Sequence, residues 1–108
     1  MAARITVQDR RIAERVPPER TPWRAFALLR PGQEVVLVNV SPGGALVESL
    51  TRMSPGTRTE LQLFGTSRCS MRGRVERCRV SGIEPLRYEG AIVFDSSLDF
   101  PKWDAWHG

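Results

Sequence analysis

The chain has 108 residues, of which 41% are hydrophobic, so it is long enough for one domain with a modest core and too short for two. Its 16 basic and 12 acidic side chains give a formal net charge of +4, and every basic residue except Lys102 is an arginine. Arginine binds phosphate with two parallel hydrogen bonds and stacks on purine rings, although a GC-rich coding sequence would also yield many arginines.

The first 22 residues are polar and rich in arginine. They contain no apolar run as long as the core of a signal peptide, and no later stretch approaches the length of a membrane span. We therefore expect a cytoplasmic protein that does not insert into a membrane. Pro17 and Pro18 remove two successive backbone donors, so we interpret residues 1–22 as a flexible arm rather than a core element.

The arm carries two patterns of paired arginines. Arg11 and Arg15 form Arg-x-x-x-Arg with Arg10 beside them, and Arg20 and Arg24 form a second pattern nearer the first predicted strand. A guanidinium group is a planar fork of donors that forms two hydrogen bonds with a phosphate or with the acceptor edge of guanine. Each pair is therefore suited to an anionic nucleotide.

Beyond the arm, apolar residues recur in short runs separated by Pro and Gly, which is typical of strands joined by turns. The predicted strands span residues 24–30, 34–40, 45–49, 58–64, a fifth strand that includes Met71 to Val80, and residues 86–94. Six short antiparallel strands without a long helix predict an all-β fold, a small six-stranded antiparallel barrel over residues 23–98, because closing the sheet removes its exposed edges.

The pattern within three of these strands predicts how they are buried. Residues 34–40 are apolar enough to be buried on both faces, whereas residues 58–64 alternate as a strand with one wet face. The fifth strand changes phase near Glu76 and Arg77, which predicts a β-bulge there.

The remaining residues do not indicate a metal or cofactor site. Cys69 and Cys78 fall on one predicted strand about 30 Å apart, too far to pair with each other. The only histidine, His107, lies in the short tail of residues 99–108, for which we expect one or two helical turns. We therefore expect no metal and no resident cofactor.

A polar turn follows the second predicted strand and reads Asn-x-Ser-x-x-Gly. Its functional candidates are Asn39, Ser41, Gly43 and Gly44. The Asn39 amide and the Ser41 hydroxyl each donate and accept hydrogen bonds, and the two glycines allow positive φ and close approach of the backbone to a bulky ligand. A second interpretation is an ordinary β-turn that stabilises its own backbone and binds nothing.

The order and spacing of these elements resemble the PilZ domain, a bacterial receptor for cyclic di-GMP. In that family an Arg-x-x-x-Arg segment precedes a strand, and Asp or Asn-x-Ser-x-x-Gly leaves the second strand. The run from Leu50 to Leu63, the sequence Arg72–Val75 and the sequence Tyr88–Phe94 are similar to later landmarks of the family. The chain departs from the family in having Asn39 where aspartate is frequent and in its shortened C-terminal helix.

The resemblance implies a PilZ-like barrel of the split-barrel type that acts as a cyclic di-GMP receptor in second-messenger signalling. Arg11 and Arg15 would clamp the phosphates and guanine, Asn39 and Ser41 would contact the base edges, and Gly44 would allow close approach. Gly43 belongs to the same ligand-binding set, and additional candidates are Arg10, Arg20 and Arg24. Ligand binding would order the arm across the barrel mouth, and an unknown effector protein would recognise the ordered arm.

Other function classes remain open at this stage. The chain could be a PilZ-fold interaction module that does not bind nucleotide, or a basic small-barrel nucleic-acid binder. Phe64, Tyr88 and Phe94 occupy core-like phases, which argues against an exposed aromatic and basic strand face, so we do not expect nucleic acid as a partner. Without a histidine in the barrel or a nucleophile beside a base, we do not expect an enzyme.

Overall fold

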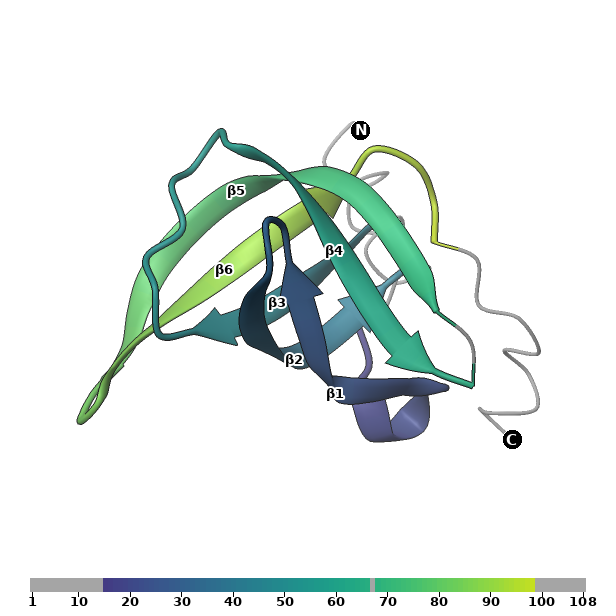
Figure 1. Cartoon of the computed structure of the whole chain (residues 1–108), viewed down its shortest axis with the longest axis horizontal. Coiled ribbons are helices and arrows are strands. Elements are labelled where there is room, and N and C mark those ends of the chain that lie inside the picture. Colours follow the sequence, from purple (N-terminus) through teal and green to yellow (C-terminus); the bar gives the residue numbers. More distant parts are fainter. Residues whose placement is uncertain (1–14, 67, 99–108) are drawn as a thin grey trace, which may run out of the picture.

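The computed structural model describes residues 15–66 and 68–98. The elements in chain order are the 3-10 helix η1 (Pro18–Arg20) and the strands β1 (Trp23–Leu29), β2 (Gln33–Ser41), β3 (Gly44–Ser49), β4 (Arg58–Gly65), β5 (Cys69–Ile83) and β6 (Leu86–Phe94). The sheet closes on itself in the order β1-β2-β3-β6-β5-β4 (Figure 1). The prediction of an all-β fold with six antiparallel strands is confirmed.

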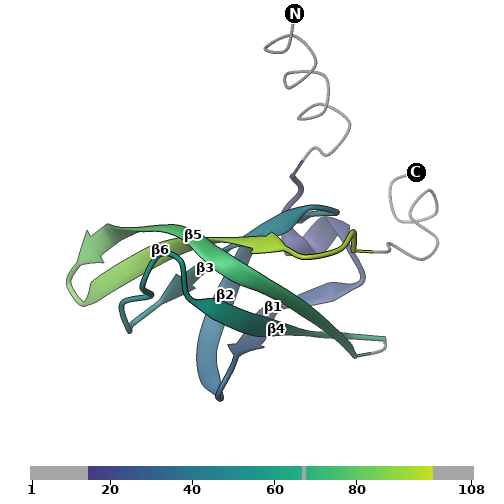
Figure 2. The same cartoon turned by 90° about the horizontal axis from the view of Figure 1, so that it is seen from above.

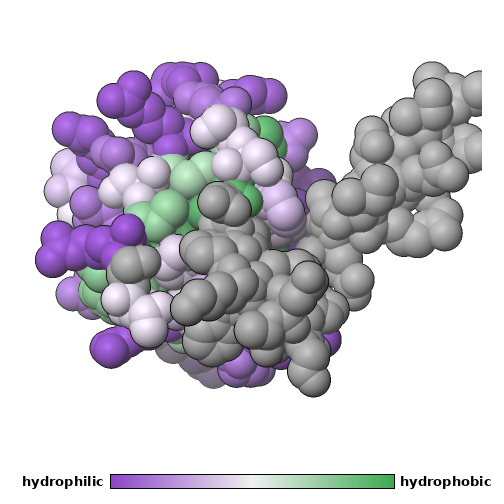
Figure 3. Space-filling view, turned by 90° about the vertical axis from the view of Figure 1, so that its right-hand side faces the viewer, coloured by the Kyte–Doolittle hydropathy of each residue, from purple (hydrophilic) through white to green (hydrophobic). Residues whose placement is uncertain are grey.

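The core fills the inside of the ring. Side chains that alternate along each strand point inward, and among the described residues the largest with almost no exposure are Leu37, Leu61, Leu63, Ile92, Val40 and Val47. The outer face is mainly polar, and Figure 3 shows one side of the molecule on which hydrophilic side chains surround a smaller hydrophobic area. Because every strand has a neighbour on both sides, closure leaves no free sheet edge along the ring.

Two of the sequence predictions about burial are wrong. Residues 34–40 are not buried on both faces, because Val36 is 50% exposed while Val35 and Leu37 are buried. Phe64 is not in a core phase, because it follows inward-facing Leu63 and lies outside the ring against Phe26. In both cases the reason is that the described residues form no second layer over the outer face, so only one face of each strand is buried.

Strand β5 confirms the predicted change of phase. Its pairing with β6 shifts register between Val75 and Arg77, and again between Val80 and Gly82. These irregularities bend the long strand, and its far part forms with β6 a hairpin that projects beyond the ring (Figures 1 and 2). The hairpin carries the exposed apolar residue Ile83 near its tip.

The packed part of the chain begins earlier than the predicted boundary at residue 23. Val16 is 2% exposed and forms an antiparallel bridge with Val40, in which each backbone N–H donates to the other residue's carbonyl at 2.9–3.0 Å. At the other end, buried Leu98 donates its N–H to the carbonyl of Pro42 at 2.7 Å. Val16 and Leu98 therefore pack against the ring from outside its named strands. No helix within the described ranges has the length and apolar character needed to cross a membrane.

Candidate functional site

The polar turn predicted from the sequence joins β2 to β3 at one end of the ring. Ser41 pairs with Gly44, and Asn39 pairs with Leu46. The register of this pairing shifts between Leu37 and Asn39, so that Asn39 faces outward beside Leu46 while Val40 remains in the core. The shift therefore places the amide on the outer face of the sheet.

The side-chain oxygen of Asn39 is an unsatisfied hydrogen-bond acceptor in the fold. It is closed off from solvent and has no hydrogen-bond partner among the described residues. A buried polar atom without a partner destabilises a folded protein by about 1–3 kcal/mol relative to one that is paired. The acceptor capacity of this oxygen is therefore unused in the fold.

Ser41 is less available than the sequence predicted. Its side chain is in the outward phase, but the residue is only 5% exposed and its Oγ donates to the carbonyl of Gly44 at 3.4 Å. This distance is at the long limit for a hydrogen bond, so the contact is weak. In this conformation Ser41 stabilises the turn, and a ligand would gain its hydroxyl only by replacing that contact.

The two glycines of the turn have different environments, and neither has the positive φ that the sequence analysis anticipated. The described glycines with positive φ are Gly32 and Gly56. A Cβ on Gly44 would lie 2.4 Å from the carbonyl oxygen of Ile92, whereas a Cβ on Gly43 would meet nothing within 4 Å. Close approach is therefore required at Gly44, but the group that approaches is the neighbouring strand β6.

The bridge between Val16 and Val40 brings the end of the arginine-rich arm to this turn. Because the bridge is antiparallel, Arg15 is placed opposite Ser41. Val16 and Val40 both point into the core, so Arg15 and Ser41 occupy the outward phase, and Arg15 is exposed. The bridge therefore places Arg15 next to the Asn39–Gly44 turn.

Two further arginines on the same outer face were missed by the sequence analysis. The pairing runs across the sheet from Asn39 to Leu46, from Leu46 to Ala91 and from Ala91 to Arg77. These four residues form one row, and three strand spacings make its width about 14 Å. Arg74 belongs to the next row, which includes Gly44. The sequence feature that could have revealed these arginines is the alternation of arginine along β5. It was not enough by itself, because only the order of strands in the sheet brings β5 near β2.

A hollow of about 440 Å³ lies over this row and has an apolar floor with charged walls. Its lining consists of Leu46, Ala91, Arg77, Arg79 and Glu89. Arg77 and Arg74 have no ion-pair partner among the described residues, so their charge is available to an anion. A planar ligand with negative groups fits this combination of small apolar floor and unpaired guanidinium groups.

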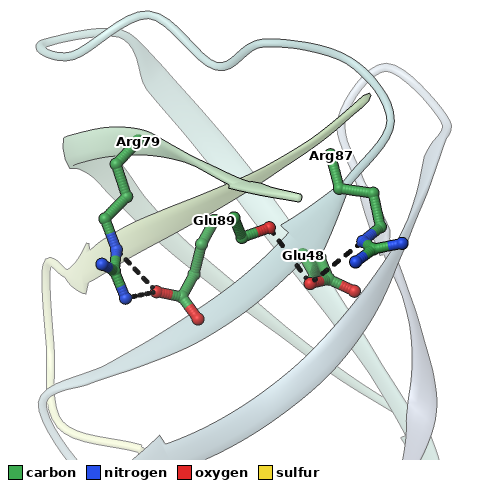
Figure 4. A network of polar contacts seen from close by, with 5 residues as sticks. Glu48, Arg79, Arg87 and Glu89 are labelled. Carbon is green, nitrogen blue, oxygen red and sulfur yellow. Dashed lines mark hydrogen bonds and ion pairs between the residues drawn. The ribbon is translucent and has the colours of Figure 1, made fainter. Parts of the chain in front are cut away.

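Two pairs of charged side chains lie near the hollow. Arg79 and Glu89 line it, and Arg79 donates from Nε and Nη2 to one carboxylate oxygen of Glu89 at 3.0 and 2.7 Å. Arg87 and Glu48 lie outside the lining, 3.7 Å apart (Figure 4). These pairs are partly exposed, so each contributes little to stability. Arg79 is thus held by Glu89, whereas Arg77 has no ion-pair partner among the described residues.

The remaining candidate arginines are placed less favourably or lie elsewhere. Arg20 is exposed in η1 and Arg24 is exposed in β1, and neither is next to a residue that pairs with the Asn39–Gly44 turn, as Arg15 is. Arg10 and Arg11 lie outside the described residues, as does the tail of residues 99–108. The structure therefore supports Arg15, rather than Arg20 or Arg24, as the arginine nearest the turn.

Within residues 15–66 and 68–98, no group of three or more His, Cys, Asp or Glu side chains is arranged to hold a metal ion. Comparisons with models of known protein families, with curated proteins and with solved structures found no match to this chain.

Proposed function

We propose that this protein is a cyclic di-GMP receptor with a PilZ-like barrel, and that it binds the nucleotide on the outer face between the arm and β5. The observation that carries the proposal is the buried, unpartnered oxygen of Asn39 on the same face as exposed Arg15 and unpaired Arg77. We take the ligand from the resemblance to the PilZ pattern, and the charges and the hollow on this face support the choice.

The chemistry of the face suits a doubly anionic purine compound. The guanidinium groups of Arg15, Arg74 and Arg77 would neutralise the two phosphates. The N–H groups on the Watson–Crick edge of guanine would donate to the Asn39 oxygen, which then loses its desolvation penalty. The hollow over Leu46 and Ala91 provides an apolar floor for a purine ring. The role proposed is binding and signalling, not catalysis.

The proposed signal is a change in the arm that leads to Val16. A ligand that binds both Arg15 and the β2–β3 turn would connect the arm to the sheet beyond the existing Val16 bridge. Contacts between guanidinium and phosphate would have to exceed the entropy lost when the arm becomes ordered. An effector protein that recognises the ordered arm would complete the pathway in the cytoplasm.

The thermal stability of the full chain tests this function. A ligand present at a hundredfold excess over its Kd stabilises the folded state by about 2.7 kcal/mol. For a fold of this size the midpoint Tm should rise by roughly 10 °C with cyclic di-GMP. Cyclic di-AMP has the same charge but different base edges, so it should raise Tm much less. Equal shifts with both ligands would contradict recognition of guanine.

Asn39→Ala should separate ligand binding from folding. Removing a buried amide oxygen that has no partner should leave the free energy of unfolding within about 1 kcal/mol of wild type, because that oxygen accepts no hydrogen bond among the described residues. The affinity for cyclic di-GMP should fall about fivefold or more, since the guanine edge loses its acceptor. Chemical denaturation and calorimetric titration measure the two effects. A large loss of stability with unchanged affinity would show that Asn39 has a structural role only.

A further inference from the structure

The outer face of β1, β4 and β5 combines two outward-facing aromatic rings, exposed Phe26 and half-buried Phe64, with arginines. In the strand pairing, Leu28 of β1 lies opposite Gln62 of β4, and Gln62 lies opposite Ser70 of β5. We call this surface the aromatic–basic face. It consists of Phe26, Leu28, Arg30, Arg58, Glu60, Gln62, Phe64, Arg68, Ser70, Arg72 and Arg74.

One end of the aromatic–basic face is a stacking platform. Phe26 is 45% exposed, and its ring centroid lies 5.5 Å from that of Phe64. The guanidinium group of Arg68 lies over the Phe64 ring, 5.8 Å from its centroid. Aromatic faces with an adjacent arginine are the surfaces on which proteins stack unpaired nucleic-acid bases.

The rest of the aromatic–basic face has an excess of positive charge. Glu60 is neutralised by Arg30, whose Nη1 donates to Oε1 at 2.7 Å, and Arg58 pairs with Asp95. Arg68, Arg72 and Arg74 have no carboxylate partner among the described residues. Three unpaired guanidinium groups along one surface form an electrostatic track for successive phosphates.

The dimensions of the aromatic–basic face suit a chain of nucleotides rather than one. From Phe64 to Arg58 the strand advances six residues, or about 20 Å. Gln62 and Ser70 lie between the aromatic end and the arginine end and offer donors and acceptors to base edges. Bases can stack on Phe26 and Phe64 only when they are not paired in a duplex, which favours a single strand.

We infer that the aromatic–basic face binds single-stranded nucleic acid. This inference goes beyond the proposed receptor function, because the cyclic di-GMP residues on β2 and β3 are not part of this face. Arg74 alone adjoins both surfaces, through its pairing with Val93 and with Arg58. Bases stack on the phenylalanines and phosphates pair with Arg68 and Arg72, so both ring and charge contribute to affinity.

Fluorescence anisotropy with the full chain tests the inference, using labelled oligo-dT and oligo-U of about twelve nucleotides and a duplex of the same length. Either single strand should bind more tightly than the duplex. Phe64→Leu and Phe26→Leu should each weaken single-strand binding about fivefold or more, while Phe64→Tyr should retain it. Phe26 provides the test if Phe64→Leu fails to fold, since Phe26 is more exposed.

Charge is tested with a matched pair of variants. Arg72→Gln should reduce the dependence of log affinity on log salt by about 0.7, the value expected for one phosphate contact on a single strand. Arg52→Gln removes the same charge from an exposed position outside the aromatic–basic face and should leave the slope unchanged. Equal effects of both variants, tighter duplex binding, or full affinity in folded Phe26→Leu would overturn the inference. Asn39→Ala should bind the single strand with the affinity of wild type. The nucleic-acid inference and the cyclic di-GMP proposal can therefore be contradicted independently of each other.

Discussion

Replacement of Gly44 by alanine is expected to lower the free energy of unfolding by about 1–3 kcal/mol, because extra volume in a closely packed sheet forces backbone to move. A Cβ at this position would lie 2.4 Å from the carbonyl oxygen of Ile92, and that atom belongs to the backbone of β6. Neither strand can rotate a side chain out of the way. Urea denaturation of the two proteins measures the difference.

Gly43→Ala is the matched control for this result. It changes the neighbouring glycine of the same turn, where a Cβ meets nothing within 4 Å and φ is not positive. The two variants should therefore differ in stability although they make the same chemical change. If Gly44→Ala is as stable as wild type and loses only affinity for the ligand, the contact between β3 and β6 is not the reason why position 44 requires glycine.

Arg15→Ala is expected to weaken cyclic di-GMP binding about tenfold or more. Hydrogen bonds to charged groups contribute about 1.5–3 kcal/mol each, and 1.4 kcal/mol corresponds to a factor of ten in affinity. Arg15 is exposed, so its loss should leave the stability of the unliganded protein nearly unchanged. Calorimetric titration of wild type and variant gives the affinity ratio.

Arg20→Ala provides the control for Arg15→Ala. It removes the same charge five residues further along, at an exposed position in η1, and it belongs to the second Arg-x-x-x-Arg pattern. We expect it to change affinity less than threefold, since only long-range charge is lost. The opposite result would be a strong loss of affinity in Arg20→Ala and none in Arg15→Ala. It would assign the phosphate and guanine contacts to Arg20 and Arg24 instead.

The number of strands and their positions along the chain were predictable because local patterns determine them. Alternation in residues 58–64 indicated which side of β4 faces the core, and Leu61 and Leu63 are fully buried there. The change of phase near Glu76 likewise indicated the irregularity in β5. Each of these features depends on the residue pattern of a single strand, so no knowledge of contacts between strands was needed.

The features that depend on strand order were not predictable. Arg77 joins the row that starts at Asn39 only because β6 lies between β3 and β5. Phe26 and Phe64 meet because the first and fourth strands pair to close the ring, which places two outward rings 5.5 Å apart. The role of Val16 as an anchor was hidden for the same reason, since its partner Val40 is distant in sequence.

The most direct test of the central claim is a titration of the 15N-labelled full chain with cyclic di-GMP, followed by two-dimensional NMR. Binding at the proposed face should shift the backbone amide signals of Arg15, Asn39, Leu46 and Arg77 with a single saturation curve. The amides of Phe26 and Phe64 should move little. No change at Arg15 and Asn39 under saturating ligand, or shifts confined to the aromatic–basic face, would contradict the claim that the arm and the β2–β3 turn hold the nucleotide together.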